Sequence, residues 1–104
     1  MAWYHFLAYL FAGILITNAI PHYVMGLTGR KFPSPFSVPP GKGESSPKVN
    51  VLWALGNIAA GFLLLQAGTF KLGLTGATLA FAIGMVVMSL LLVKQFGQLY
   101  SPHQ

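Results

Sequence analysis

Residues 72–94 read LGLTGATLAFAIGMVVMSLLLVK, and this stretch decides the fold. From Leu72 to Val93 it carries no charged side chain, and most of its residues are apolar. An α-helix rises about 1.5 Å per residue, so about 20 apolar residues cross a hydrocarbon core about 30 Å thick. We therefore predict that residues 72–94 form a transmembrane helix.

Two further apolar segments precede this helix, at about residues 3–27 and about residues 50–68. The first contains Pro21, which removes a backbone hydrogen bond, but membrane helices tolerate this loss when neighbours satisfy the freed carbonyl. The three segments predict an all-α fold, a polytopic membrane protein with three transmembrane helices. Residues 1–104 are expected to form a single membrane domain.

The composition supports this class of protein. Hydrophobic residues make up 55% of the chain and charged residues only 7%, whereas soluble domains are about a quarter charged. The basic residues stand at the ends of the apolar segments, which is typical of membrane proteins rather than of nucleic-acid binding. We therefore expect membrane lipids and no nucleic acid as partners. The absence of cysteine excludes disulfides and thiolate metal sites.

The connection between the first two helices, residues 28–49, is predicted to be a proline-rich loop. Its prolines prevent a long helix. They are Pro33, Pro35, Pro39, Pro40 and Pro47. The connection between the second and third helices is short, around residues 67–73, so these two helices are predicted to be antiparallel neighbours.

The basic residues also predict the orientation. Five of the six lie in the loop or at the end of the third helix, and only Lys71 lies on the other side. Because cytoplasmic loops are rich in Lys and Arg, we expect the loop and the C-terminus inside and the N-terminus outside. The first segment lacks the basic start of a secretory signal and is expected to remain as an anchor. Trp53, near a predicted span end, is expected at the membrane interface.

A candidate polar site involves both of the first two helices. Asn18 and His22 are four residues apart and share one helix face, and the second helix offers Asn50 and Asn57. Such side chains are costly in lipid, so they indicate either a polar cavity or interhelical hydrogen bonds that hold the bundle together. We predict that His22 faces protein and bonds to the backbone or to an asparagine of the second helix, under the loop around Pro35.

Small residues predict where helices approach closely. The third helix carries Gly76, Ala80 and Gly84 at intervals of four, and the second carries Gly61. Such small-xxx-small patterns let two backbones come together in a membrane. The odd number of helices is a further reason to expect an oligomer.

The inventory of reactive side chains is small. Glu44 is the sole acid, so no carboxylate pair for acid–base catalysis and no carboxylate metal site can form. His5 and His22 stand near opposite ends of one helix and cannot hold one haem together. We therefore expect a protein that is not an enzyme, with no catalytic residues, no metal and no cofactor.

Three stretches carry a resemblance to known proteins: PHYVMGLTGRKF at 21–32, PF at 35–36 and VNVLW at 49–53. The chain resembles small, uncharacterised bacterial three-helix membrane proteins over residues 18–61, which implies a bacterial inner membrane and no particular reaction. Its size and helix count are also similar to the SemiSWEET half-transporters, three-helix dimers that move sugars. Their first helix carries a Pro-Gln dipeptide, whereas here Pro21 is followed by His22 and the first loop is longer.

Two functions remain in front, and a membrane enzyme or a lipid-binding protein that uses His22 is a third. The favoured one is a small structural or accessory membrane protein that oligomerises or joins a larger membrane complex, because so few side chains could perform chemistry. The alternative is a homo-oligomeric transporter or channel for small solutes, with a polar site near Asn18, His22 and Asn57.

Overall fold

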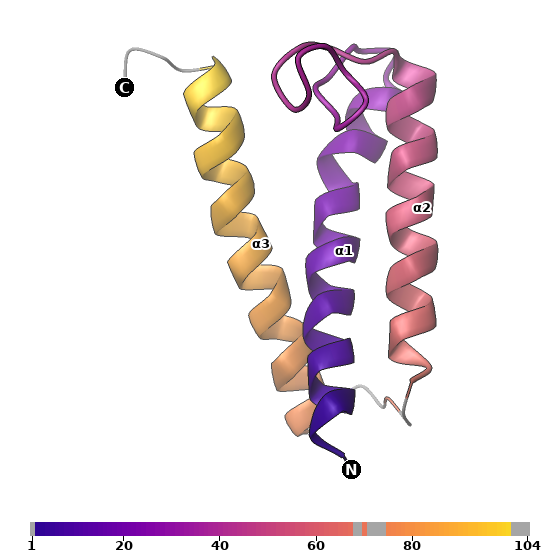
Figure 1. Cartoon of the computed structure of the whole chain (residues 1–104), viewed down its shortest axis with the longest axis vertical. Helices are drawn as coiled ribbons and strands as arrows, with labels where there is room; N and C mark the ends of the chain where they lie inside the picture. Colours follow the sequence, from indigo (N-terminus) through magenta and orange to yellow (C-terminus); the bar gives the residue numbers. More distant parts are fainter. Residues whose placement is uncertain (1, 68–69, 71–74, 101–104) are drawn as a thin grey trace.

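Figure 1 shows a computed structural model of the chain, which describes residues 2–67, 70 and 75–100. In this part of the chain there are three α-helices: α1 (Trp3–Leu27), α2 (Pro47–Leu65) and α3 (Gly76–Tyr100). Outside the helices, the described residues contain one isolated antiparallel bridge, between Phe32 and Ser45, and no strand. Each helix is long and apolar enough to cross a membrane. The predicted all-α fold with three spans is confirmed.

The bounds of α1 coincide with the predicted range, but α2 begins earlier, at Pro47. The prediction that Pro47 belongs to the loop and prevents a helix there is wrong. Proline is favoured in the first turn, where its missing N–H would have no helical partner. The preceding Ser46 caps the helix, because its hydroxyl accepts a hydrogen bond from the Val49 N–H at 3.2 Å. The predicted end of α2 at Gly68 is also too late, since the helix ends at Leu65.

The third helix extends beyond its predicted end at Lys94 and reaches Tyr100. Its predicted start at Leu72 lies outside the described residues. Before the helix, the Thr75 hydroxyl accepts a hydrogen bond from the Thr78 N–H at 3.1 Å, the geometry of a helix N-cap. The two extra turns at the C-terminal end place Gln95 and Phe96 on the helix, which matters for the site described below.

The helices lie side by side with α1 in the middle (Figure 1). Both α2 and α3 pack against α1, and within the described residues no Cα atom of α2 lies within 8 Å of one of α3. The prediction that the second and third helices are neighbours is therefore wrong. A short connection requires only that their ends lie at the same end of the molecule. Which helices touch is decided by small residues, and α1 presents Gly13 to α3 and Gly26 to α2.

The contact between α1 and α3 is closest at two glycines. A Cβ added to Gly13 would overlap the Phe81 carbonyl of α3, and one added to Gly84 would overlap the Leu10 carbonyl of α1. Of the predicted stripe on the third helix, Gly84 thus lies in the contact, and Gly76 lies against α1 as well, because an added Cβ would be 3.1 Å from the Phe6 ring. Ala80 is half-buried. Toward its C-terminal end, α3 leans away from α1 (Figure 1).

The contact between α1 and α2 has a core of small and polar side chains. The buried residues of α2 follow one helix face, and two of the four are asparagines. They are Asn50, Ala54, Asn57 and Gly61. Gly61 faces α1, because an added Cβ would collide with the Ile16 side chain. Polar groups in such a place need hydrogen-bond partners across the interface.

A glycine turns the chain out of α1. Gly29 has a positive φ of 74°, a conformation that glycine adopts without steric cost. The Arg30 N–H bonds to the Met25 carbonyl at 2.9 Å and the Gly29 N–H to that of Gly26 at 3.1 Å. This is the Schellman pattern that ends helices. The chain then folds back over the end of the bundle as residues 28–46, here called the cap loop.

Candidate functional site

Serine side chains hold the cap loop in one shape. Ser34, Ser37 and Ser45 are buried although they belong to a loop. The Ser34 and Ser45 hydroxyls bond to each other at 2.6 Å, and the Ser37 hydroxyl donates to the Ser34 carbonyl at 2.6 Å. The Gly41 N–H donates to the same carbonyl at 2.9 Å. A proline-rich segment with few backbone hydrogen bonds thereby becomes a folded cap.

Asn50 joins the cap loop, α2 and α1 in a single set of hydrogen bonds. Its side chain is fully buried. Its Nδ2 donates to the carbonyls of Phe32 at 2.9 Å, Ser46 at 3.1 Å and Ser45 at 3.3 Å. Its Oδ1 lies 2.8 Å from Nδ1 of His22. The three carbonyls fix the orientation of the amide, so Oδ1 accepts and Nδ1 of His22 carries the proton.

His22 is buried between α1, α2, α3 and the cap loop, and one side of it borders the cavity described below. It is only 3% exposed. Its ring stands edge to face against Phe32 of the cap loop, with centroids 5.4 Å apart, and against Phe96 of α3, at 6.2 Å. The predicted orientation toward protein and the predicted bond to an asparagine of α2 are both present. Nε2 has no hydrogen-bond partner among the described residues.

A second polar pair lies one helical turn from His22. Asn18 Nδ2 donates to Asn57 Oδ1 at 3.3 Å, and Asn57 Nδ2 donates to the Trp53 carbonyl at 2.9 Å. The four predicted site residues are thus brought together as two pairs, Asn18 with Asn57 and His22 with Asn50. Interhelical polar contacts of this kind contribute about 0.6–2 kcal/mol each. Both pairs tie α1 to α2.

A cavity of about 550 Å³ lies between the cap loop, α1 and the C-terminal half of α3. It exists because α3 leans away from α1 in this half of the molecule (Figure 1). Its polar lining includes Asn18, His22, Ser34, Trp53, Lys94, Gln95 and Gln98. Its apolar lining on α3 consists of Met88, Leu91, Leu92 and Phe96. Asn50 and Asn57 do not line it, so only one member of each polar pair borders the cavity.

Two contacts join α3 to the cap loop at the edge of this cavity, one made by Gln95 and one by Phe96. Gln95 Nε2 donates to the Gly41 carbonyl at 3.0 Å, and the rings of Phe96 and Phe32 lie 4.5 Å apart. A second, mostly apolar hollow of about 520 Å³ lies on another side of Phe96, which borders both. It also includes Thr17, which is buried and whose hydroxyl has no hydrogen-bond partner among the described residues.

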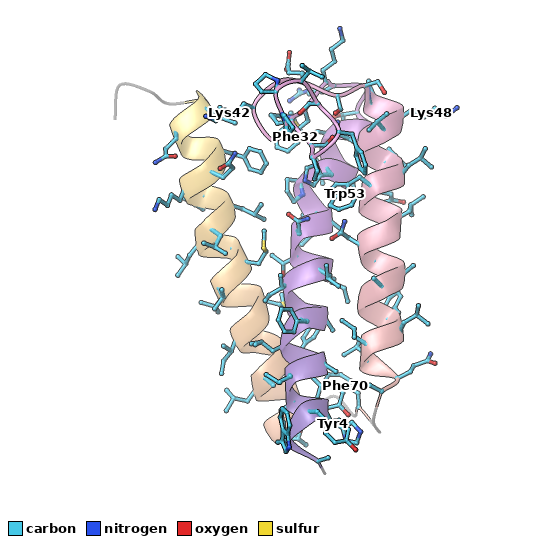
Figure 2. The ribbon with its side chains drawn as sticks, in the orientation of Figure 1. Tyr4, Phe32, Lys42, Lys48, Trp53 and Phe70 are labelled. Carbon is cyan, nitrogen blue, oxygen red and sulfur yellow. The ribbon has the colours of Figure 1, made fainter. Side chains whose placement is uncertain are left out.

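Trp53 occupies a place that the sequence did not indicate. Its ring lies beneath the cap loop between α1 and α2 (Figure 2), and its position at the membrane interface stays a prediction. The ring packs edge to face against Phe36 at 5.4 Å. Its Nε1 is buried and has no hydrogen-bond partner among the described residues. An unpaired buried donor beside a cavity was not visible in the sequence, because it depends on where the loop folds.

Among the described residues that line the cavity, His22 and Lys94 are the two whose side chains could take part in proton transfer. Among the described residues, no group of three or more His, Asp or Glu gathers where a metal ion could be held. Glu44 is exposed on the cap loop and is not part of the lining. What remains is a set of hydrogen-bonding groups next to an apolar wall.

Comparison with protein-family models, with curated proteins and with solved structures finds no match to this chain. The site is therefore interpreted from its own geometry.

Proposed function

We propose that this chain is a small accessory integral membrane protein that associates with further copies of itself. The observation that carries the proposal is the open arrangement of the helices. Both α2 and α3 pack against α1, and among the described residues no Cα atom of α2 lies within 8 Å of one of α3. In a closed three-helix bundle each helix would touch two others. Here α2 and α3 each keep a flank on which another helix can pack.

The use of the polar residues supports an accessory role. The side-chain amides of Asn50 and Asn57 donate to backbone carbonyls, of Phe32 in the cap loop and of Trp53 in α2 respectively. Interhelical hydrogen bonds of this type are common in membrane bundles that perform no chemistry. Paired in this way, Asn50 and Asn57 serve the packing of the chain itself, which is what an accessory protein requires of them.

The flank of α2 that contains Gly56 and Ala60 fits a second copy. Gly56 is exposed, and an added Cβ would meet nothing within 4 Å. Gly56 and Ala60 are spaced by four, so a partner helix could approach their backbone closely. Gly61, in contrast, is already used in the contact with α1.

Oligomeric state in lipid nanodiscs tests this proposal. We expect more than one chain per particle, measured by mass photometry or single-molecule photobleaching, and a shift toward one chain with Gly56→Leu. Gly97→Leu is the matched control, because Gly97 of α3 is equally open and lies near the end of its helix. A single chain per particle for the unmodified protein at every protein-to-disc ratio would refute self-association.

We also propose a bacterial inner membrane with the cap loop in the cytoplasm. The cap loop and the C-terminal end of α3 lie at one end of the molecule, and Tyr4 and Phe70 at the other (Figure 2). The cap-loop end carries Arg30, Lys31, Lys42, Lys48 and Lys94, the bias expected for a cytoplasmic side.

Cysteine labelling tests the orientation, because the chain has no native cysteine. Val38 is 91% exposed on the cap loop. Val38→Cys should resist an impermeant maleimide in intact cells and react after permeabilisation, whereas Ala2→Cys should react in intact cells. The opposite pattern would reverse the orientation.

The transport alternative is favoured by one observation, the cavity bordered by Asn18 and His22. All its lining residues come from the half of the molecule near the cap loop. In the other half, the Gly13 and Gly84 backbones bring α1 and α3 together. A path across the membrane would need a second chain to complete it. Solute-driven swelling of proteoliposomes with small polyols, compared with protein-free vesicles, tests this alternative.

A further inference from the structure

The cavity beside His22 presents unpaired hydrogen-bonding groups on one wall and apolar side chains on the other. Nδ1 of His22 donates to Asn50, so Nε2 is left as an acceptor. Nε1 of Trp53 is a buried donor without a partner among the described residues. Buried polar groups are nearly always hydrogen-bonded, so the unpaired Nε1 of Trp53 beside the cavity calls for an explanation. A bound molecule would supply both missing partners.

The chemistry of the lining defines that molecule. A hydroxyl group would donate to Nε2 of His22, and an oxygen would accept from Nε1 of Trp53. Lys94 borders the cavity and favours a negative charge. Met88 and Leu91 offer an apolar wall on α3. Pockets of about 300–1,000 Å³ are typical for small molecules, and this cavity of about 550 Å³ lies within that range.

We propose that this cavity binds an anionic, hydroxyl-bearing glycerophosphate group, with an attached acyl chain running along α3. Such a head group carries hydroxyl donors, oxygen acceptors and a negative charge together. A phosphocholine head group has no hydroxyl, and its quaternary ammonium would meet Lys94 with like charge. The site is therefore expected to discriminate between phosphatidylglycerol and phosphatidylcholine.

The position of the cavity suits a lipid head group. His22 lies five residues before Leu27, the end of α1, or about 7.5 Å along the helix axis. The same end of the molecule carries most of the basic residues, which attract anionic lipids in the cytoplasmic leaflet. This inference goes beyond the accessory role, because it holds for a single chain whether or not the protein self-associates.

Quenching of Trp53 fluorescence tests the proposal. The chain has two tryptophans, so Trp3→Phe leaves Trp53, which borders the cavity, as the sole reporter. The variant is reconstituted in phosphatidylcholine vesicles that contain a small fraction of either phosphatidylglycerol or phosphatidylcholine brominated at the same acyl position. We expect stronger quenching by brominated phosphatidylglycerol. The reverse variant, Trp53→Phe, leaves Trp3, the first residue of α1 at the end of the molecule away from the cap loop, and should show no such preference.

Matched variants separate the cavity from general attraction to basic residues. Met88→Phe with Leu91→Phe adds bulk at two lining positions and leaves the charge unchanged, and it should bring the ratio of the two quenching values close to one. Val86→Phe with Leu90→Phe adds the same bulk at two exposed α3 positions outside the lining, and the preference should remain. Lys94→Gln should lower the preference.

Soluble glycerol 3-phosphate distinguishes the two sources of the head group. If it abolishes the preference, the free head group is a ligand; if it does not, the intact lipid is. Equal quenching by the two brominated lipids, in a variant whose circular dichroism is unchanged, would overturn the proposal. A preference that survives the cavity-filling pair would also overturn it, because the lipid would then bind elsewhere.

Discussion

Replacing Asn50 with leucine should destabilise the protein more than replacing any other residue of the polar pairs. The substitution keeps the approximate volume of the side chain and removes both amide groups. It cuts the bonds from Nδ2 to three cap-loop carbonyls and the bond from Oδ1 to His22. The consequences for the carbonyls and for the imidazole differ.

The carbonyls retain other partners. Those of Ser45, Phe32 and Ser46 also accept backbone N–H groups, from Phe32, Ser45 and Asn50 respectively. Losing the amide therefore costs only the net value of a hydrogen bond there, about 0.5–1.5 kcal/mol. The Nδ1–H of His22 would lose its acceptor inside a residue that is 3% exposed, and a buried unsatisfied donor costs about 1–3 kcal/mol. The expected loss of unfolding free energy is the sum of these two contributions, about 1.5–4.5 kcal/mol.

Asn57→Leu is the matched comparison. Asn57 accepts from Asn18 at 3.3 Å, and Asn18 borders the cavity, where its freed amide can bind water. We expect a loss of about 0.5–1.5 kcal/mol for this variant. Both variants are measured by titrating detergent micelles with sodium dodecyl sulfate and following helicity by circular dichroism.

A double variant tests the role of the imidazole directly. His22→Phe combined with Asn50→Leu removes donor and acceptor together, so it should be less destabilised than the sum of the two single variants. If Asn50→Leu is no less stable than Asn57→Leu, or if the double variant is simply additive, the assignment of Asn50 as the central clamp fails.

Two further substitutions test other contacts. Gly84→Leu should weaken the α1–α3 contact and lower the midpoint of thermal unfolding, because its side chain would meet the Leu10 backbone; Gly97→Leu, with nothing within 4 Å, should leave the midpoint unchanged. Ser46→Ala removes the cap of α2 and should cost about 1 kcal/mol in the same unfolding titration, while Ser46→Asp, which can still accept from the Val49 N–H, should retain most of the stability.

The spans were predictable because length and hydropathy alone determine them. The end of α1 was predictable too, since Gly29 supplies the left-handed residue that ends the helix. The start of α2 was missed because Pro47 was treated as a breaker, although Ser46 followed by Pro47 is itself a start signal. The prediction of which helices are neighbours was wrong because packing depends on which helix faces carry small residues. The length of a connection gives no information about those faces.

The candidate site was predictable only in part. Spacing placed Asn18 and His22 on one helix face, and the cost of polar groups in lipid implied partners on α2. The further partners of Asn50 are backbone carbonyls of the cap loop. A pattern of side chains in the sequence cannot predict which carbonyls the folded loop will bring to this amide. The cavity depends on how α3 leans and on the extra turns that carry Gln95 and Phe96, so the sequence could not indicate it.

The pairing of polar residues between α1 and α2 has a consequence for biogenesis. As a segment leaving the translocon alone, α1 would carry Asn18 and His22 into the bilayer without the amides that later bind them. It should therefore wait at the translocon until α2 has been synthesised, and the two helices should partition into lipid as a pair. The contact of α3 with α1 centres on glycine backbones such as that of Gly84, so α3 should insert on its own hydrophobicity and join them afterwards.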